Sequence, residues 1–166
     1  MKVTDEYVFG KASDFSKSEV ERFKNIVINA GEVTEVTFDG LLEKDPILLF
    51  IPNPIKIQAV GALKIPNDEY KVKVFTKSKT TENSMDYQFE LGWVVSLTSG
   101  NGKKLVEILS QITPNIYATV RCKNNKMKHI LEKFRFAKSG QSYKSDINNY
   151  EIELYLKGEK KEIKTI

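Results

Sequence analysis

The sequence predicts a single α/β domain built on a mixed sheet, and three observations lead to that fold class. The chain has 166 residues, which suits one domain with a sizeable hydrophobic core. Short apolar runs typical of strands alternate along the chain with runs of helical periodicity. No internal repeat or interdomain linker interrupts this order. We therefore expect one domain over residues 1–158 and a charged, fraying tail over residues 159–166.

The first half of the chain predicts two helices framed by strands. Ser16 and Glu19 stand at the spacing of a capping box, and Gly31 is a natural helix stop. The second helix has a weaker pattern, because β-branched residues and Gly40 blur its period. The predicted elements are a strand at residues 7–9, helices at 16–31 and 33–44, and strands at 47–51 and 57–65.

Residues 67–86 are compatible with two structures. Tyr70, Val74 and Phe75 could form one face of a short helix, while part of the same stretch also alternates like a strand. The polar residues 76–86 indicate a loop.

Residues 88–95 show the clearest strand pattern, because apolar residues alternate along them. One face would carry Phe89, Leu91, Trp93 and Val95, and the other Gln88, Glu90, Gly92 and Val94. A turn-rich loop follows at residues 96–102. The elements predicted after it are helices at residues 103–112 and 124–134, and strands at 116–121, 137–145 and 150–156.

Composition and single-copy residues argue against several classes of function. Cys122 is the only cysteine, so the chain can form neither an internal disulfide nor a cysteine cluster for zinc. His129 is the only histidine, and its lysine-rich surroundings favour the solvated side of a helix over a catalytic triad. The net charge of +4 is compatible with an anionic ligand without indicating nucleic acid. No apolar run is long enough to cross a bilayer and residues 1–10 lack a signal-peptide pattern, so we expect a cytoplasmic protein.

The loop over residues 97–104 carries the main chemical signal. Gly100 and Gly102 allow the backbone to turn tightly and to approach a ligand closely. They open directly into a helix, whose first amides are unpaired and lie at the positive end of the helix dipole. Lys103 and Lys104 add positive charge in the same turn. The pattern predicts an anion site, although a loop that only needs flexible residues would look the same.

Two nucleotide-binding motifs do not fit this loop. A phosphate-binding P-loop would require glycine at the position of Leu97 and a hydroxyl at that of Lys104. A dinucleotide-binding fingerprint would require a third glycine at the position of Leu105.

Three stretches fit another family better. Residues 90–96 read ELGWVVS, residues 100–106 read GNGKKLV, and residues 121–136 read RCKNNKMKHILEKFRF. In this order and spacing they resemble the GNAT superfamily of acyl-CoA-dependent N-acetyltransferases, and the order of predicted elements resembles that family's fold. The resemblance implies a mostly antiparallel sheet of about seven strands flanked by about four helices. It also implies that the fourth and fifth strands splay apart.

The resemblance further implies acetyl-CoA as co-substrate, with no metal. The glycines of the loop would wrap the pyrophosphate with backbone amides, and the end of the preceding strand would pair with the pantetheine arm. Glu90 would be the general base that takes a proton from the acceptor amine. The residues implied to bind the donor are Val94, Val95, Ser96, Leu97, Ser99, Gly100, Asn101, Gly102, Lys103, Lys104, Asn124 and Asn125.

Several positions depart from the family pattern. Leu97 replaces the usual Arg or Gln of the loop, and Leu131 stands where the family carries a tyrosine that protonates the leaving thiolate. Tyr143 is our candidate for that proton donor, Tyr117 is a poorer one, and both could be packing aromatics. Cys122 could carry an acyl group covalently, but buried packing is the stronger interpretation.

The expected function is transfer of an acetyl group to a primary amine of a small molecule or peptide. The alternatives are a catalytically weak coenzyme A binder, a member directed at nucleic acid or protein, and an unrelated module whose glycines only form a turn. Residues 32–44 and 70–87 are the expected acceptor-recognition segments. The sequence is also compatible with a homodimer.

Overall fold

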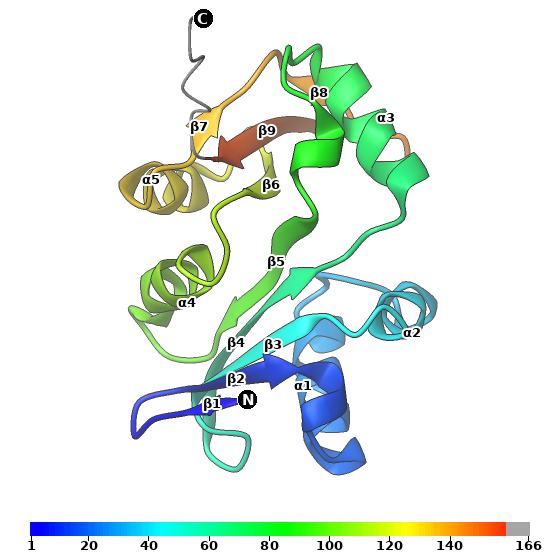
Figure 1. Cartoon of the computed structure of the whole chain (residues 1–166). Coiled ribbons are helices and arrows are strands. Elements are labelled where there is room, and N and C mark those ends of the chain that lie inside the picture. Colours follow the sequence, from blue (N-terminus) through cyan, green and yellow to red (C-terminus); the bar gives the residue numbers. More distant parts are fainter. Residues whose placement is uncertain (159–166) are drawn as a thin grey trace, which may run out of the picture.

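The computed structural model describes residues 1–158, and its centre is one open sheet with helices on both faces (Figure 1). The strand order is β1-β2-β3-β4-β5-β6-β9-β7, and β8 also pairs with β9. Neighbouring strands are antiparallel, except that β5 and β6 run parallel. The nine strands are β1 (Lys2–Val3), β2 (Val8–Lys11), β3 (Ile47–Pro52), β4 (Ile57–Lys64), β5 (Phe89–Ser96), β6 (Ile116–Arg121), β7 (Ala137–Lys138), β8 (Tyr143–Lys144) and β9 (Glu151–Lys157). The mixed, mostly antiparallel sheet is confirmed, while the predicted tail at 159–166 lies outside the described residues.

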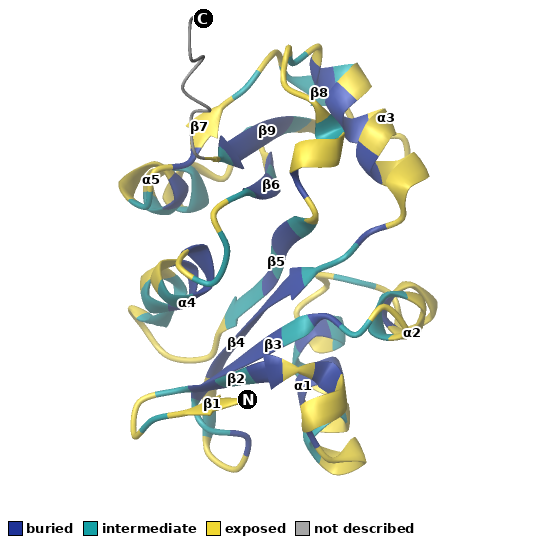
Figure 2. Cartoon of the chain, in the orientation of Figure 1, coloured by how far each residue is buried: buried dark blue, intermediate teal, exposed yellow. Residues whose placement is uncertain are grey.

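Helices cover both faces of this sheet. The chain over residues 1–158 forms α1 (Lys17–Asn29), α2 (Glu35–Leu42), α3 (Asp68–Ser78), α4 (Asn101–Ser110) and α5 (Asn125–Lys133), with short 3₁₀ turns η1 (Ala12–Asp14) and η2 (Ser84–Asp86). Figure 2 shows that the long central strands are mostly buried, whereas the short strands β1 and β7 are exposed, and each helix keeps an exposed outer side. Phe23 of α1 and Phe38 of α2 pack on one face, and Leu105 of α4 and Leu131 of α5 belong to the core on the other. Helix α3 lies on the same face as α1 and α2, where Phe75 packs against residues of β6 and β9.

Side-chain caps explain where several helices begin. Ser16 and Glu19 form the predicted capping box at the start of α1. Thr34 and Asn124 cap α2 and α5 by accepting a backbone N–H in the first turn. Helix α4 differs, because Gly100 stands at its N-cap with φ of 88° and no side chain caps the turn. The helix therefore begins at Asn101, two residues before the predicted start.

The fourth and fifth predicted strands, residues 88–95 and 116–121, correspond to β5 and β6, and the predicted splay lies between them. The two strands pair only through Phe89 with Ile116 and Glu90 with Tyr117, and then they separate (Figure 1). On its other side β5 stays paired with β4 as far as Ser96. The β6-facing backbone of β5 beyond Glu90 therefore has no strand partner, and those polar groups are available to a ligand.

The predicted alternation of β5 is wrong beyond Gly92, because a β-bulge interrupts the strand. The pairing with β4 shifts between Val60 and Ala62, so that one residue of β4 opposes two of β5. Trp93 adopts a positive φ of 52° at this point. As a result Leu91 packs against the α4 side, whereas Trp93 packs against α1 and α2.

Two other predictions change in the structure. Residues 68–78 form a helix, so the helical alternative was the correct one and the predicted loop begins three residues later. The predicted strand at 137–145 is wrong, because it breaks into β7 and β8. The break centres on Gly140, which has φ of 71° and whose Cβ would stand 2.0 Å from the carbonyl oxygen of Ser78. The backbone is held there by the end of α3, because the amide of Gln141 donates to the same oxygen at 2.6 Å.

Within residues 1–158 no helix is both long and apolar enough to cross a membrane.

Candidate active site

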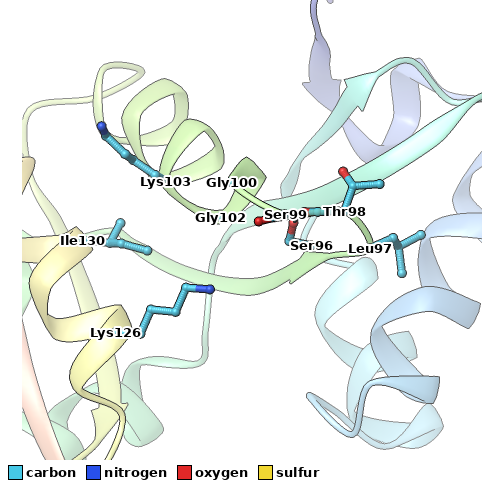
Figure 3. Close-up of a pocket in the computed structure, with 9 residues that line it drawn as sticks. All are labelled: Ser96, Leu97, Thr98, Ser99, Gly100, Gly102, Lys103, Lys126 and Ile130. Carbon is cyan, nitrogen blue, oxygen red and sulfur yellow. Dashed lines mark hydrogen bonds between the residues drawn. The ribbon is translucent and has the colours of Figure 1, made fainter.

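The loop after β5 forms one wall of a surface pocket of about 270 Å³ (Figure 3). Its lining consists of Ser96, Leu97, Thr98, Ser99, Gly100, Gly102, Lys103, Lys126 and Ile130. The side-chain amide of Asn101 donates to Thr98 Oγ1 at 2.5 Å, which holds the turn in shape from outside the pocket. The uncapped first turn of α4 borders this pocket, so its unpaired amides are available to an anion.

Lysines concentrate positive charge around the pocket. Figure 3 shows Lys126 reaching from α5 toward the loop, while Lys103 lies on the first turn of α4. The ammonium of Lys103 also lowers the pKa of Lys133, the last residue of α5. Grouped like charges repel unless an anion compensates them, so this end of the molecule favours a ligand with several negative charges.

The remaining donor-binding candidates lie around the pocket without lining it. Lys104 forms an ion pair with Glu6 at 3.1 Å, which turns its charge away from the lining. Val94 packs on the α4 side of the sheet and Val95 on the α1 side, as the bulge requires. Asn124 accepts from the amide of Met127 at 3.1 Å, and Asn125 is the first residue of α5.

Glu90 is the main ionisable group where the splay begins. It is 3% exposed, and its carboxylate accepts from Tyr117 Oη at 3.4 Å and from Thr119 Oγ1 at 3.3 Å. Lys64 Nζ lies 3.4 Å from the same carboxylate. Two hydroxyls and one ammonium thus hold this buried carboxylate at the point where the two strands separate.

The bulge of β5 makes room for this ion pair. A Cβ on Gly92 would stand 2.6 Å from Cε of Lys64, so only glycine lets the lysine lie across the strand. The ammonium of Lys64 also lies 5.6 Å from the centre of the Trp93 ring. Lys64 and Glu90 are direct cross-strand partners, and the missing side chain of Gly92 lets the lysine lie across β5.

Three tyrosines surround Glu90 on the α3 side of the sheet. Burial, and then the charge of Glu90, raise the pKa of Tyr117 and of Tyr143 well above the ordinary value. The charge of Glu90, and then burial, raise the pKa of Tyr70 in the same direction. All three hydroxyls therefore stay protonated near neutral pH, so each can donate a hydrogen bond.

The other sequence candidates fall in separate places. Tyr143 lies on β8 and packs against the cluster that contains Tyr117. Leu131 is 1% exposed in the core, as expected for packing, and His129 is on the exposed side of α5. Cys122 is half-buried just after β6, and its amide donates to Glu151.

The sequence did not indicate Lys64, Thr119 or Lys126, whereas Tyr70 lies in the segment 70–87 expected to recognise the acceptor. Lys64 and Thr119 become neighbours of Glu90 only through strand register, which leaves no local pattern in the chain. Lys126 had a usable signal, because it lies in the first turn of a predicted helix beside the implied coenzyme loop.

Comparison with known proteins yields structural similarity alone. No protein-family model matches the sequence, and no curated protein matches it. An acyl-CoA N-acyltransferase from Pseudomonas aeruginosa superposes with a TM-score of 0.65 at 15% identity, covering 92% of this chain and 99% of that one. FeeM, an N-acyl amino acid synthase from uncultured soil microbes, gives 0.65 at 11% identity, over 93% of this chain and 92% of that one. NAA60 of Arabidopsis thaliana in complex with acetyl-CoA gives 0.58 at 11% identity, over 90% of this chain and 97% of that one.

Further similar structures are described as GNAT-family acetyltransferases. The chain therefore has the fold of the GNAT superfamily, with its sheet order and its splayed pair of strands complete within residues 1–158. Identities of 9–15% among these similar structures relate this chain to them by fold, and they leave the chemistry to be argued from its own residues.

Proposed function

We propose that this protein is an N-acyltransferase that moves the acyl group of an acyl-CoA, acetyl-CoA in the simplest case, to a primary amine. The observation that carries the proposal is the buried carboxylate of Glu90, which lies at the point where β5 and β6 separate. The lysine-rich pocket after β5 opens from the same strand. One strand thus connects a group suited to proton removal with a surface suited to a polyanionic donor.

The donor would lie along the separated part of β5. Its pyrophosphate would accept hydrogen bonds from the first amides of α4. The ammonium groups of Lys103 and Lys126 would attract its negative charge. Its pantetheine arm would pair with the backbone of Val94, Val95 and Ser96 on the edge of β5 that faces away from β4 and has no strand partner. This use of backbone groups supports the proposal despite Leu97, because amides need no particular side chain.

The reaction would proceed by direct attack. The acceptor arrives as an ammonium ion, since an alkylamine is protonated at neutral pH, and Glu90 takes one proton from it. The neutral nitrogen then forms a bond to the thioester carbon, while a backbone N–H near Val95 stabilises the developing oxyanion. The carbon–sulfur bond breaks as the nitrogen loses its second proton, and Tyr143 would relay that proton: its hydroxyl donates one proton to the departing thiolate and takes one from the nitrogen. The raised pKa of Tyr143 keeps this hydroxyl protonated before the reaction.

Two measurements test the proposal in sequence. Acetyl-CoA should raise the thermal unfolding midpoint, because a ligand that binds only the native state stabilises it. Thiol release from acetyl-CoA over a panel of primary amines should then exceed the rate without amine. Absence of a midpoint shift at millimolar acetyl-CoA would refute acetyl-CoA as the donor. A shift without amine-dependent thiol release would mean that the protein binds coenzyme A without transferring an acyl group.

A further inference from the structure

Arg121 stands at the wide end of the splay, outside the machinery assigned above. It is the last residue of β6, and side chains two residues apart on a strand share a face. Tyr117 and Thr119 both donate to Glu90, so Arg121 continues the same row away from that carboxylate. Its cross-strand partner Ile152 also pairs with Tyr143, which belongs to the same face.

The guanidinium of Arg121 is held by an aromatic ring instead of a carboxylate. Its Cζ lies 4.3 Å from the centre of the Tyr150 ring, and the Tyr150 hydroxyl accepts from Asn148 at 2.9 Å. Stacking uses the flat face of a guanidinium and leaves the N–H groups at its edge free to donate. Among the ion pairs of the described chain, Arg121 takes part in none, although its side chain is exposed and preoriented.

The charges facing Arg121 come from the other side of the splay. Glu32, an exposed residue in the link between α1 and α2, interacts electrostatically with both Arg121 and Lys64. Lys64 is already committed to Glu90 at 3.4 Å. Arg121 forms no ion pair with Glu32 in the described chain, so its guanidinium can take a new anionic partner.

The spacing suits a short bifunctional molecule. A strand rises about 3.3 Å per residue, so Arg121 lies roughly 7 Å along β6 from Thr119, whose hydroxyl touches the Glu90 carboxylate. An amine bound at Glu90 would thus lie a few bonds away from an anionic group bound at Arg121.

We propose that Arg121 binds a carboxylate or phosphate of the acceptor, so that the acceptor is a small zwitterion with a primary amine at one end and an anion at the other. This assignment rests on the acyl transfer proposed above and adds the acceptor's class to it. A guanidinium forms paired hydrogen bonds with either anion, and loss of such a charged contact weakens binding by about 10- to 100-fold.

Matched acceptors test the assignment directly. We expect 4-aminobutyrate and O-phosphoethanolamine to be acetylated with kcat/KM at least about 10-fold above that of neutral 4-aminobutyramide. Arg121→Gln should raise KM for the two anionic amines by about 10-fold or more, leave the neutral amide unchanged, and retain acetyl-CoA affinity. The last readout shows that the variant is folded, and Arg135→Gln, an exposed arginine after α5, is the matched control. A preference for only one of the two anions would identify whether carboxylate or phosphate is the natural partner.

Two outcomes would overturn the assignment, and they are distinguishable. Equal kcat/KM for charged and neutral acceptors, or an equal loss for both in Arg121→Gln, would refute the anion contact while acyl transfer stands. Acetyl-CoA binding without acetylation of any amine would refute the transferase activity and this assignment together.

Discussion

The two sides of the splay are built in different ways. The proposed donor side is a contiguous stretch of chain, residues 96–103, which offers mainly backbone amides, with Lys126 added from α5. The proposed acceptor side is assembled from Lys64, Glu90 and Thr119, side chains on three strands that meet only in the folded sheet. A backbone site tolerates sequence change, whereas a side-chain site depends on each residue. Substitutions should therefore separate donor binding from turnover.

The largest effect is expected from filling the donor pocket. Gly102 lines it, and a Cβ there would meet only Ile130 at 3.9 Å, so Gly102→Leu would project into the pocket without disturbing the core. We expect acetyl-CoA affinity to fall by about 100-fold or more, and turnover at low donor concentration to fall with it. Gly40→Leu is the control, because this glycine of α2 also has open space around it. Unchanged acetyl-CoA titration of Gly102→Leu would mean that the donor lies elsewhere.

The next effect separates chemistry from binding. Glu90→Gln keeps the shape of the side chain and removes the base, so amine-dependent thiol release should fall by about 100-fold. Acetyl-CoA affinity should stay within about twofold of the wild-type value, because only the acceptor side changes. Glu153→Gln controls for loss of a buried, ion-paired carboxylate, since Glu153 pairs with Lys128 at 3.0 Å on another part of the sheet. Wild-type rates in Glu90→Gln would exclude Glu90 as the base.

A smaller effect tests the charges of the donor side. Lys126→Ala should weaken acetyl-CoA binding by roughly 5-fold at low salt and less at high salt, because an exposed ion pair is screened. Lys104→Ala should have no such effect, since that ammonium is paired with Glu6. Isothermal titration at two ionic strengths measures both variants. Equal losses for Lys104 and Lys126 would show that general charge, and not the pocket, attracts the donor.

The smallest expected effect comes from removing the ion pairs between Asp146 and α3. Asp146 pairs with Lys73 and Lys77 of α3, and these ammonium groups lower its pKa to about 2. A lowered folded-state pKa means that the ion pairs stabilise the fold above the ordinary aspartate value of about 3.9, and that this contribution is lost as the pH falls toward 2. Asp146→Asn should lower the unfolding midpoint slightly at pH 7, and the difference from wild type should disappear near pH 2. A difference that persists at pH 2 would assign the effect to something other than these pairs.

The sequence predicted the features that are determined by residues close together in the chain. The glycine loop and helices α4 and α5 could be predicted, because Gly100, Gly102, the apolar stripe of α4 and Asn124 lie within a few residues of what they determine. The bulge at Trp93 could not, because it depends on how β4 pairs with β5. The same register brings Lys64 to Glu90, so the most important neighbour of the proposed base carried no signal in the chain.

Amide hydrogen exchange with and without acetyl-CoA is the decisive test of donor binding at the end of β5 and the first turn of α4. The first amides of α4 lack partners in the helix, so they should exchange fast in the free protein and slow down when phosphates accept from them. We expect protection over residues 94–103 at saturating acetyl-CoA and unchanged exchange in α2. Binding without protection of residues 94–103 would contradict this expectation.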